Sequence, residues 1–278
     1  MVNDLGAGLL PAGELPNRPT VSTPKSVEEE LAPHREKMKE HLSMLLEKVA
    51  NNGPFCSHPD AVLKVTVDKE HWPKLVRRQY PIPHELMPLL RVVIQGWRDI
   101  GKVVRAPSGC QFNSPLLVAP KHDKSGHISG LRVCFDARQL NTYMNEYDNF
   151  PIPHIPDVLE KFKGNTLFGE FDLSEAYTQF RVTVESQPYF AFTVDKEQLM
   201  FAAAPYGIKN MPALFQRFMS TLFADMSFVF PYIDNLPFAS RDWDEHEMHA
   251  RMILERLDSV NMKIKASATD LATLRSPF

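Results

Sequence analysis

The stretch Phe228–Ser240 constrains the fold most, because two polar residues interrupt an otherwise apolar run. The run reaches Ile233, breaks at Asp234-Asn235 and resumes at Leu236. Asp and Asn tolerate turn geometry, so the pattern predicts a tight β-hairpin with these two residues at its turn. Such a turn would lift the Asp234 carboxylate out of an apolar sheet. Taken alone, the stretch also fits a surface hairpin with a polar tip.

A second acidic residue, Asp172, has a similar setting upstream. It follows a short apolar strand that ends at Phe171, and Ser174 is placed to cap the helix expected after it. A carboxylate at a strand end beside a helix N-terminus suits a hard cation, and two close carboxylates resist joint ionisation unless a cation lies between them. If the two strands lie side by side, Asp172 and Asp234 could share Mg²⁺. The alternative is that both are ordinary turn or capping residues.

Composition limits the classes of protein to consider. The chain has 278 residues, 44% of them hydrophobic, which is enough for one large or two small domains. Its formal net charge of −3 lacks the basic bias that favours nucleic acid, although local basic patches remain compatible with it. Three cysteines, Cys56, Cys110 and Cys134, lack metal-ligand spacing and suit a reducing compartment. Without a bilayer-length apolar run or a leader, we expect an intracellular protein, cytoplasmic or nuclear, not secreted and without a membrane partner.

The N-terminal part is expected to carry no chemistry. Residues 1–25 are rich in small and polar residues and are predicted to be a disordered tail. Residues 26–60 are predicted to be a helical extension, in which Ser26 and Glu29 have capping-box spacing and Pro33 breaks or delays the start. An apolar stripe at helical spacing predicts that this helix docks on the rest of the chain through Met38, Leu42, Leu45, Leu46 and Val49.

A polar hairpin is predicted between two apolar strands, Leu116–Ala119 and Leu131–Asp136. It follows a helix expected over His84–Ile100, which Gly101 ends. The cations of this hairpin could clasp a polyphosphate, because Lys and Arg neutralise phosphate oxygens; they are Lys121, Lys124 and Arg132. Solvated charges at strand ends are the alternative.

The remaining pattern predicts strands followed by helices. Three antiparallel strands are expected over Gln179–Val184, Tyr189–Val194 and Gln198–Ala203. Helices are expected over Leu214–Ala224 and Asp242–Val260. The last helix carries His246 and His249, whose spacing could bind a metal, although a polar helix face is the favoured interpretation.

Several segments carry a family resemblance when taken together. They are Asn113-Ser-Pro-Leu-Leu-Val-Ala-Pro-Lys121 with Leu131-Arg-Val-Cys-Phe-Asp-Ala-Arg-Gln-Leu-Asn141, Phe150-Pro-Ile-Pro-His-Ile155, Phe171-Asp-Leu-Ser-Glu-Ala-Tyr-Thr-Gln179, Pro205-Tyr-Gly-Ile-Lys-Asn-Met-Pro-Ala-Leu-Phe-Gln216, Tyr232-Ile-Asp-Asn235 and Glu245-His-Glu-Met-His249. In this order they resemble the reverse transcriptase domain of gypsy-type LTR retrotransposon polyproteins, with similarity from about Arg78 to Lys265. One such motif is a weak signal, but the ordered set is specific.

The resemblance implies an α+β fold, the fingers and palm of a right-hand polymerase, with helices packed behind an antiparallel palm sheet. The implied fingers cover residues 61–147 with 180–208, and the implied palm covers 148–179 and 209–265. Residues 266–278 are expected to be a C-terminal tail, with the thumb absent.

The resemblance also implies an activity, RNA-directed DNA polymerisation by two-metal chemistry with Mg²⁺ or Mn²⁺. The implied partners are an RNA or DNA template-primer, deoxynucleoside triphosphates and other domains of a retroelement polyprotein. By resemblance, Asp172 and Asp234 would bind metal, and Lys121 and Arg132 would hold the triphosphate. The other implied site residues are Tyr177, which would exclude a ribose 2′-hydroxyl, and Tyr206 and Gln216, which would line the pocket around base and template.

One departure from the family pattern affects the expected chemistry. Asn235 stands where the family has a second adjacent aspartate, so the site keeps its shape and loses one negative charge. We expect activity to fall, because each 1.4 kcal/mol lost is about tenfold in rate. The alternative function is an inactive retroelement remnant that acts at most as a weak nucleic-acid or protein binding module.

Overall fold

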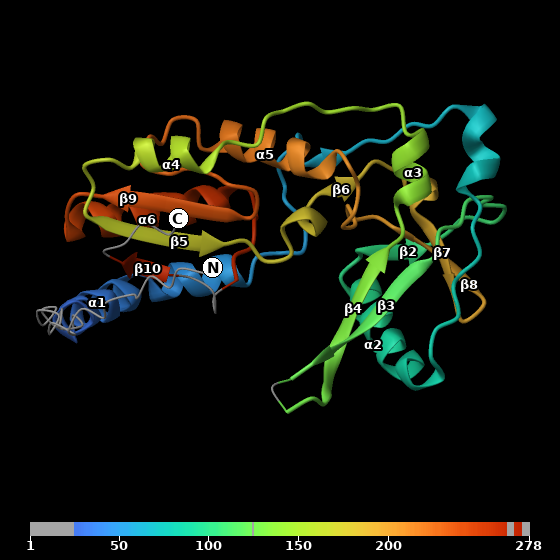
Figure 1. The fold of residues 1–278 in the computed structure, drawn as a ribbon, viewed down its shortest axis with the longest axis horizontal. Helices are drawn as coiled ribbons and strands as arrows, with labels where there is room; N and C mark the ends of the chain where they lie inside the picture. The colour runs from blue at the N-terminus through green and yellow to red at the C-terminus, as the bar shows by residue number, and fades with distance from the viewer. Residues whose placement is uncertain (1–24, 124, 266–269, 274–278) are drawn as a thin grey trace, which may run out of the picture.

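The computed structural model describes residues 25–123, 125–265 and 270–273 (Figure 1). Its elements fall into two groups along the long axis of the molecule. We call the first the palm portion, around β5 (Leu167–Asp172), β9 (Asn235–Ser240) and β10 (Asp270–Thr273). We call the second the fingers portion, around β2 (Val103–Arg105), β3 (Leu116–His122), β4 (Ile128–Phe135), β7 (Ala191–Val194) and β8 (Glu197–Phe201). Residues 1–24 of the tail predicted over residues 1–25 lie outside the described residues, as does Lys124, and Lys25 is the first residue of a helix.

The palm sheet is antiparallel with the strand order β10-β5-β9. The expected C-terminal tail is therefore wrong for residues 270–273, which form a strand of this sheet. Gly169 in the central strand is required by packing, since a Cβ there would lie 2.4 Å from the Phe238 ring. The sheet is thus tightly filled at its centre, and it holds the ends of β5 and β9 in a fixed relation.

Helices cover the palm sheet. They are α1 (Lys25–Ala50), α4 (Ile155–Lys161), α5 (Met211–Leu222) and α6 (Trp243–Ser259), with α4 and α5 along the upper edge in Figure 1. Helix α6 begins at an N-cap, because the Asp242 side chain accepts a hydrogen bond from the Glu245 amide at 2.9 Å. It packs on β9, where the His246 ring stacks on Phe238.

Helix α1 continues through Pro33, so the predicted break there is wrong. The predicted stripe is correct, since Met38, Leu42 and Val49 are buried. Helix α1 packs along α6, and an ion pair joins Lys48 to Asp258 at 2.6 Å. The buried stripe offsets the hydrogen bond that proline removes, which is worth about 1 kcal/mol.

The fingers portion contains a three-stranded antiparallel sheet, β2-β8-β7, and the hairpin β3–β4. The hairpin confirms the predicted pair of strands and extends them. Helix α2 (Met87–Asp99) follows a 3₁₀ turn at His84–Leu86, and Gly101 ends the segment with a φ of +73°. The short helix α3 (Arg138–Tyr143) follows β4.

The strand predicted over residues 179–184 is mostly wrong. Only Arg181–Val182 forms a strand there, β6, and it pairs in parallel with β1 (Val62–Leu63) rather than with β7. Gln179 belongs instead to a 3₁₀ helix, Ala176–Gln179. Other 3₁₀ turns lie at Lys69–Leu75 and Gln187–Phe190.

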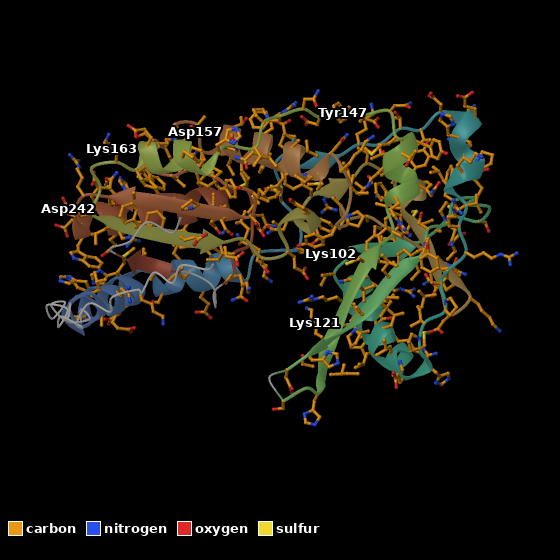
Figure 2. All side chains as sticks on the ribbon, viewed as in Figure 1. Lys102, Lys121, Tyr147, Asp157, Lys163 and Asp242 are labelled. Carbon is orange, nitrogen blue, oxygen red and sulfur yellow. The ribbon has the colours of Figure 1, made fainter. Side chains whose placement is uncertain are left out.

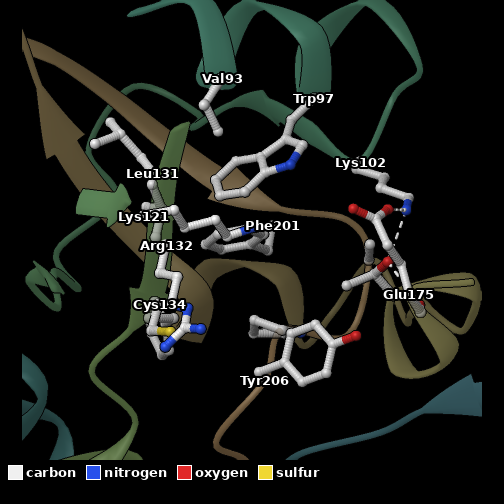
Figure 3. A pocket seen from close by; sticks show the side chains of 15 residues that line it. Val93, Trp97, Lys102, Lys121, Leu131, Arg132, Cys134, Glu175, Phe201 and Tyr206 are labelled. Atoms are coloured by element: carbon white, nitrogen blue, oxygen red, sulfur yellow. Dashed lines mark hydrogen bonds and ion pairs between the residues drawn. The ribbon is translucent and has the colours of Figure 1, made fainter. Parts of the chain in front are cut away.

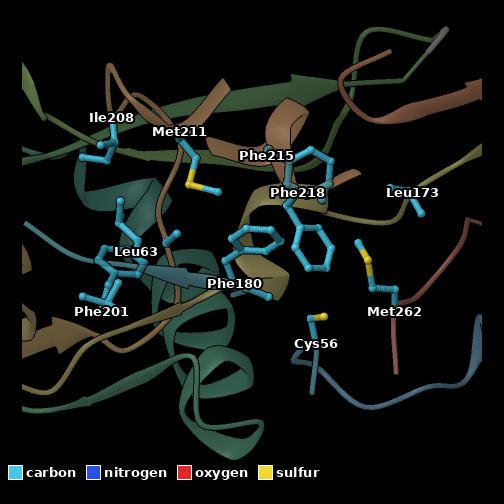
Figure 4. Close-up of a cluster of buried hydrophobic side chains, with 14 of the residues drawn as sticks. Cys56, Leu63, Leu173, Phe180, Phe201, Ile208, Met211, Phe215, Phe218 and Met262 are labelled. Carbon is cyan, nitrogen blue, oxygen red and sulfur yellow. The ribbon is translucent and has the colours of Figure 1, made fainter. Parts of the chain in front are cut away.

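One apolar core runs from the palm portion into the fingers portion (Figure 4). Phe180 lies at its centre, with ring centroids 5.1 Å from Phe215 and 5.0 Å from Phe218. Each such buried ring contributes about 2–3 kcal/mol, so the two portions are packed as one body. The predicted α+β class is correct. Among the helices within the described ranges, none is both long and apolar enough to cross a bilayer.

Candidate active site

The structure brings Asp172 and Asp234 together at one end of the palm sheet. Asp172 is the last residue of β5 and pairs in register with Asn235, the first residue of β9. Asp234 immediately precedes that pair, and its carbonyl accepts a hydrogen bond from the Leu173 amide at 2.9 Å. The prediction that the two strands lie side by side is confirmed. Two carboxylates therefore lie at the same end of the palm sheet. Asp172 is partly buried and Asp234 is exposed.

The turn before β9 lies one residue earlier than predicted. Tyr232 and Asn235 exchange hydrogen bonds of 2.9 and 3.0 Å, which makes Ile233 and Asp234 the two turn residues. Ile233 has a φ of +53°, a left-handed conformation that is rare for a β-branched residue. Because Asp234 lies within the turn and Asn235 within the strand, the carboxylate projects beyond the sheet edge.

Gln216 supports this turn from helix α5. Its side chain is fully buried; Nε2 donates to the Pro231 carbonyl at 2.8 Å and Oε1 accepts from the Ile233 amide at 2.9 Å. The resemblance placed Gln216 in the lining of the nucleotide pocket. The structure instead places it beneath the turn, where one side-chain amide bonds to the Pro231 carbonyl and to the amide of the strained residue Ile233.

The segment after Asp172 also differs from the prediction. Ser174 does not cap a helix, because its amide donates to the Lys263 carbonyl and the 3₁₀ helix starts two residues later. Glu175 occupies the N-cap position with a φ of +48°. This short helix presents Tyr177, whose ring lies 5.4 Å from that of Tyr206.

Burial and nearby carboxylates raise the pKa of both tyrosines. Partial desolvation, followed by the carboxylates of Glu175 and Asp234, raises the pKa of Tyr206 to about 12. Desolvation and Asp234 also raise the pKa of Tyr177. Both hydroxyls therefore stay protonated at neutral pH and remain hydrogen-bond donors.

A cavity of about 480 Å³ opens between the two portions (Figure 3). Lys121 and Arg132 enter it from the hairpin, on the same face because Arg132 pairs with Ala119, two residues before Lys121. Figure 2 shows Lys102 and Lys121 on the side of the fingers portion that faces the palm portion. Tyr206 closes the lower wall in Figure 3. Lys121, Arg132 and Tyr206 thus line one cavity, and their roles in holding a triphosphate and lining a nucleotide pocket stay predictions.

Sequence reasoning missed the part that three residues play in this wall, namely Lys102, Glu175 and Thr178. The Lys102 ammonium lies 2.6 Å from Glu175 Oε2 and 2.6 Å from Thr178 Oγ1. The signal was a lysine between Gly101 and the apolar strand β2, a position where a charged side chain needs a partner.

The carboxylates suit a small hard cation. Within the described ranges no three His, Cys, Asp or Glu side chains are arranged to hold a metal ion. Mg²⁺, however, is commonly bound by one or two carboxylates with waters and substrate phosphates, which Asp172 and Asp234 can satisfy. Lys265 Nζ lies 3.7 Å from Asp172 Oδ2, so one ammonium already faces this carboxylate. Asp172 and Asp234 therefore fit the ion, with one charge fewer than three carboxylates would give.

His246 and His249 form neither a metal site nor a polar helix face. His246 is fully buried and His249 nearly so. Each lies within hydrogen-bond distance of Ser240 Oγ, at 2.9 and 2.8 Å, and His249 stacks on Phe228. Burial lowers the pKa of both imidazoles, that of His246 to about 4, so they pack as neutral groups.

Comparison with known proteins agrees with this geometry. Residues 119–275 match the reverse transcriptase (RNA-dependent DNA polymerase) family. The chain belongs to this family. The Tf2-7 and Tf2-3 transposon polyproteins of Schizosaccharomyces pombe are each 30% identical over 205 residues, which is 72% of this chain and 15% of the polyprotein. The resemblance to retrotransposon reverse transcriptases is confirmed, and the chain spans about 15% of the length of these relatives.

Solved reverse transcriptases share the fold. A foamy viral protease-reverse transcriptase in complex with double-stranded DNA matches with a TM-score of 0.73 and 21% identity, over 96% of this chain and 47% of that one. The foamy viral enzyme in complex with an RNA/DNA hybrid matches with a TM-score of 0.71 and 22% identity, over 92% and 34%. The predicted fingers-and-palm fold is therefore confirmed.

Proposed function

We propose that this chain carries the fingers and palm of an RNA-directed DNA polymerase and adds deoxynucleotides to a template-paired primer. One observation carries the proposal: Asp172 and Asp234 meet at the edge of the palm sheet, next to a cavity lined by Lys121 and Arg132. Phosphoryl transfer needs positioning and charge stabilisation rather than covalent help from the protein. The two carboxylates beside two cationic side chains can supply both positioning and charge stabilisation.

Each residue has a distinct part in the proposed reaction. Lys121 and Arg132 bind the triphosphate, and Tyr206, with the Tyr177 ring packed beside it, forms the wall near the sugar. Asp172 and Asp234 would hold Mg²⁺ or Mn²⁺, which when bound offsets the charge of the phosphates and makes the primer oxygen a better nucleophile. Gln216 fixes the turn that presents Asp234.

We propose residues 61–147 and 180–208 as the fingers and 148–179 and 209–265 as the palm. Nucleic acid as template-primer is supported by the foamy viral relatives, which were solved with double-stranded DNA and with an RNA/DNA hybrid. Other domains of a polyprotein are proposed partners as well, because the relatives are polyproteins. Three free thiols, Cys56, Cys110 and Cys134, support a reducing location in the cytoplasm or nucleus.

A second candidate function rests on Asn235. This residue pairs with Asp172, so a neutral amide lies where an acid would add charge beside the cation. A chain that binds nucleic acid or a protein weakly and makes no bonds fits this substitution. The two candidates differ in whether Asp172 contributes to turnover.

Primer extension on a primed homopolymer RNA, with Mg²⁺ or Mn²⁺, separates them. The chain would be compared with Asn235→Asp, Asp172→Ala and the control Asp157→Ala, an exposed acid on α4. We expect weak incorporation that Asp172→Ala abolishes, that Asn235→Asp raises about tenfold, and that Asp157→Ala leaves unchanged. Silence in all four proteins would reject the polymerase and favour the binding module.

A further inference from the structure

The Lys102 ammonium is the buried charge of the cavity wall. Lys102 is 5% exposed, and its Nζ contacts Glu175 Oε2 and Thr178 Oγ1, each at 2.6 Å. The Thr178 hydroxyl donates to the Glu175 carbonyl at 3.0 Å, so its oxygen is free to accept from the ammonium. Both contacts are therefore charge-assisted hydrogen bonds, which are the stronger kind.

This cluster joins the two portions of the molecule. Lys102 lies just before β2, and its carbonyl accepts from the amides of Ala202 and Ala203, so its backbone is fixed in the fingers portion. Glu175 and Thr178 lie in the palm segment that follows Asp172. Figure 3 shows the pair spanning the right-hand wall of the cavity, with Tyr206 below it. The ion pair thus ties the fingers to the palm next to the proposed nucleotide.

Glu175 adopts a conformation that needs support. Its φ is +48°, and the left-handed region costs a non-glycine residue about 1–2 kcal/mol. Such a conformation persists where the surroundings fix it. Here the Lys102 contact fixes the side chain, and the 3₁₀ helix that carries Tyr177 begins at the next residue.

The same contact sets the charge of the cavity. The wall holds three cationic side chains, Lys102, Lys121 and Arg132, and the Glu175 carboxylate, which is 58% exposed. Without Lys102, that carboxylate would lose its partner and face an incoming polyanion. Like charges at close range oppose binding, and the sum of local charges governs the affinity for anions.

We propose that Lys102 is a positioning residue for the substrate. It neutralises the Glu175 carboxylate, so that the cavity accepts the polyphosphate of a nucleoside triphosphate. This inference rests on the proposed function, because it assumes that the cavity is the nucleotide site. It goes beyond that function in naming a residue that touches neither the metal nor the substrate and still sets substrate affinity.

Calorimetric titration of the full chain with inorganic tripolyphosphate tests the inference. Metal-free buffer is used so that the result does not depend on whether Asp172 and Asp234 hold a cation. The variants are Lys102→Met, Glu175→Gln and the double variant, and the control is Lys163→Met, which removes an exposed lysine of the palm portion. We expect Lys102→Met to weaken binding about tenfold or more, and Glu175→Gln to tighten it about twofold. The double variant should bind within about threefold of the unmodified chain, since it keeps the same net charge.

The outcomes separate the inference from the function on which it rests. Rescue in the double variant supports the inference, because a merely structural tie would lose more with both partners changed. Lys102→Met binding like the unmodified chain, or a double variant weaker than Lys102→Met, overturns the inference and leaves the proposed polymerase standing. Absence of binding by the unmodified chain overturns both the nucleotide site and the inference. Binding with the expected ranking but no primer extension supports the inference and rejects the catalysis.

Discussion

Two turns of this molecule have the same length and different chemistry. The turn between β7 and β8 consists of Asp195 and Lys196, with φ values of +51° and +66°. The turn before β9 consists of Ile233 and Asp234, and Ile233 has a φ of +53°. Both turns reverse the chain in two residues, which requires left-handed backbone. Only the second presents a carboxylate at the proposed active site.

The difference shows where the fold accepts strain. Asp is among the residues that tolerate the left-handed region, and Asp195 pairs with Arg91 on the surface at 2.6 Å. Ile is β-branched, so its cost there exceeds the usual 1–2 kcal/mol. Gln216 supplies the support, because it bonds to the Pro231 carbonyl and the Ile233 amide. Strain fixed in this way is common at functional sites.

The largest expected effect comes from removing the carboxylate of the turn before β9, compared with removing that of the turn between β7 and β8. Asp234→Asn should lower primer extension about a thousandfold, or roughly 4 kcal/mol, because the cation would lose one of two charged ligands. Asp195→Asn should leave extension within about twofold, since it disturbs a surface ion pair. Steady-state extension by the two variants, side by side, measures the contrast. Equal losses in both would contradict the assignment of the active-site turn.

The sequence predicted the fold through its long patterns. The α1 stripe, helix α2 and the β3–β4 hairpin follow from periodicity, and the ordered motifs implied the palm. The position of the Asp234 turn was missed by one residue, since composition favoured Asp-Asn over Ile-Asp. The Gln216 bonds, which come from helix α5, support the isoleucine there, and a local pattern does not show them.

The misses at the site share a cause. Gln216, Lys102 and the pair of buried histidines each depend on a partner from another element, which a local pattern does not show. Strand β10 was missed because a four-residue strand carries little periodicity, and its pairing with β5 supplies the stability. Hydrogen bonds between elements thus determine the structure at these positions, where local sequence propensity does not.

Acid should destabilise the palm sheet, which bears the turn before β9, more than the sheet β2-β8-β7, which bears the other turn. The Leu271 carbonyl of β10 accepts from His246 Nε2 at 2.7 Å, so His246 Nδ1 accepts from Ser240. Burial lowers the pKa of His246 to about 4, so the unfolded chain binds the proton more tightly. The stability that depends on a neutral His246 is fully present above about pH 6.5. It is lost as pH falls toward 4, by roughly 3 kcal/mol in all. Asp195 has a lowered pKa beside Arg91, so its pair survives this range.

Hydrogen exchange at pH 7 and pH 4.5 measures this difference. Relative to the intrinsic exchange rate at each pH, the amides of β10 and β5 should lose more protection at the lower pH than those of β7 and β8. His246→Asn should flatten the pH dependence of the free energy of unfolding, whereas His127→Asn, at an exposed position, should not. Uniform loosening of both sheets would speak against His246 as the titrating group.

Gln216→Met tests the support beneath the strained turn. The substitution keeps the volume and removes both hydrogen bonds to the turn, which leaves the Pro231 carbonyl and the Ile233 amide without this partner. We expect a loss of about 1–3 kcal/mol in the free energy of unfolding. Gln95→Met on α2, whose side chain is exposed, should cost less than about 0.5 kcal/mol. Urea denaturation of both variants gives the values, and equal costs would show that the turn does not depend on Gln216.

The smallest effect comes from relaxing each turn with glycine. Glycine adopts left-handed backbone freely, so Lys196→Gly should raise stability by about 1 kcal/mol without changing primer extension. Ile233→Gly relieves more strain but also removes a half-buried side chain, so its net stability change should stay within about 1 kcal/mol. Extension should nevertheless fall several-fold, because the freed turn no longer fixes Asp234. Calorimetry and extension on both variants decide this, and full activity in Ile233→Gly would mean that the strain has no part in presenting the carboxylate.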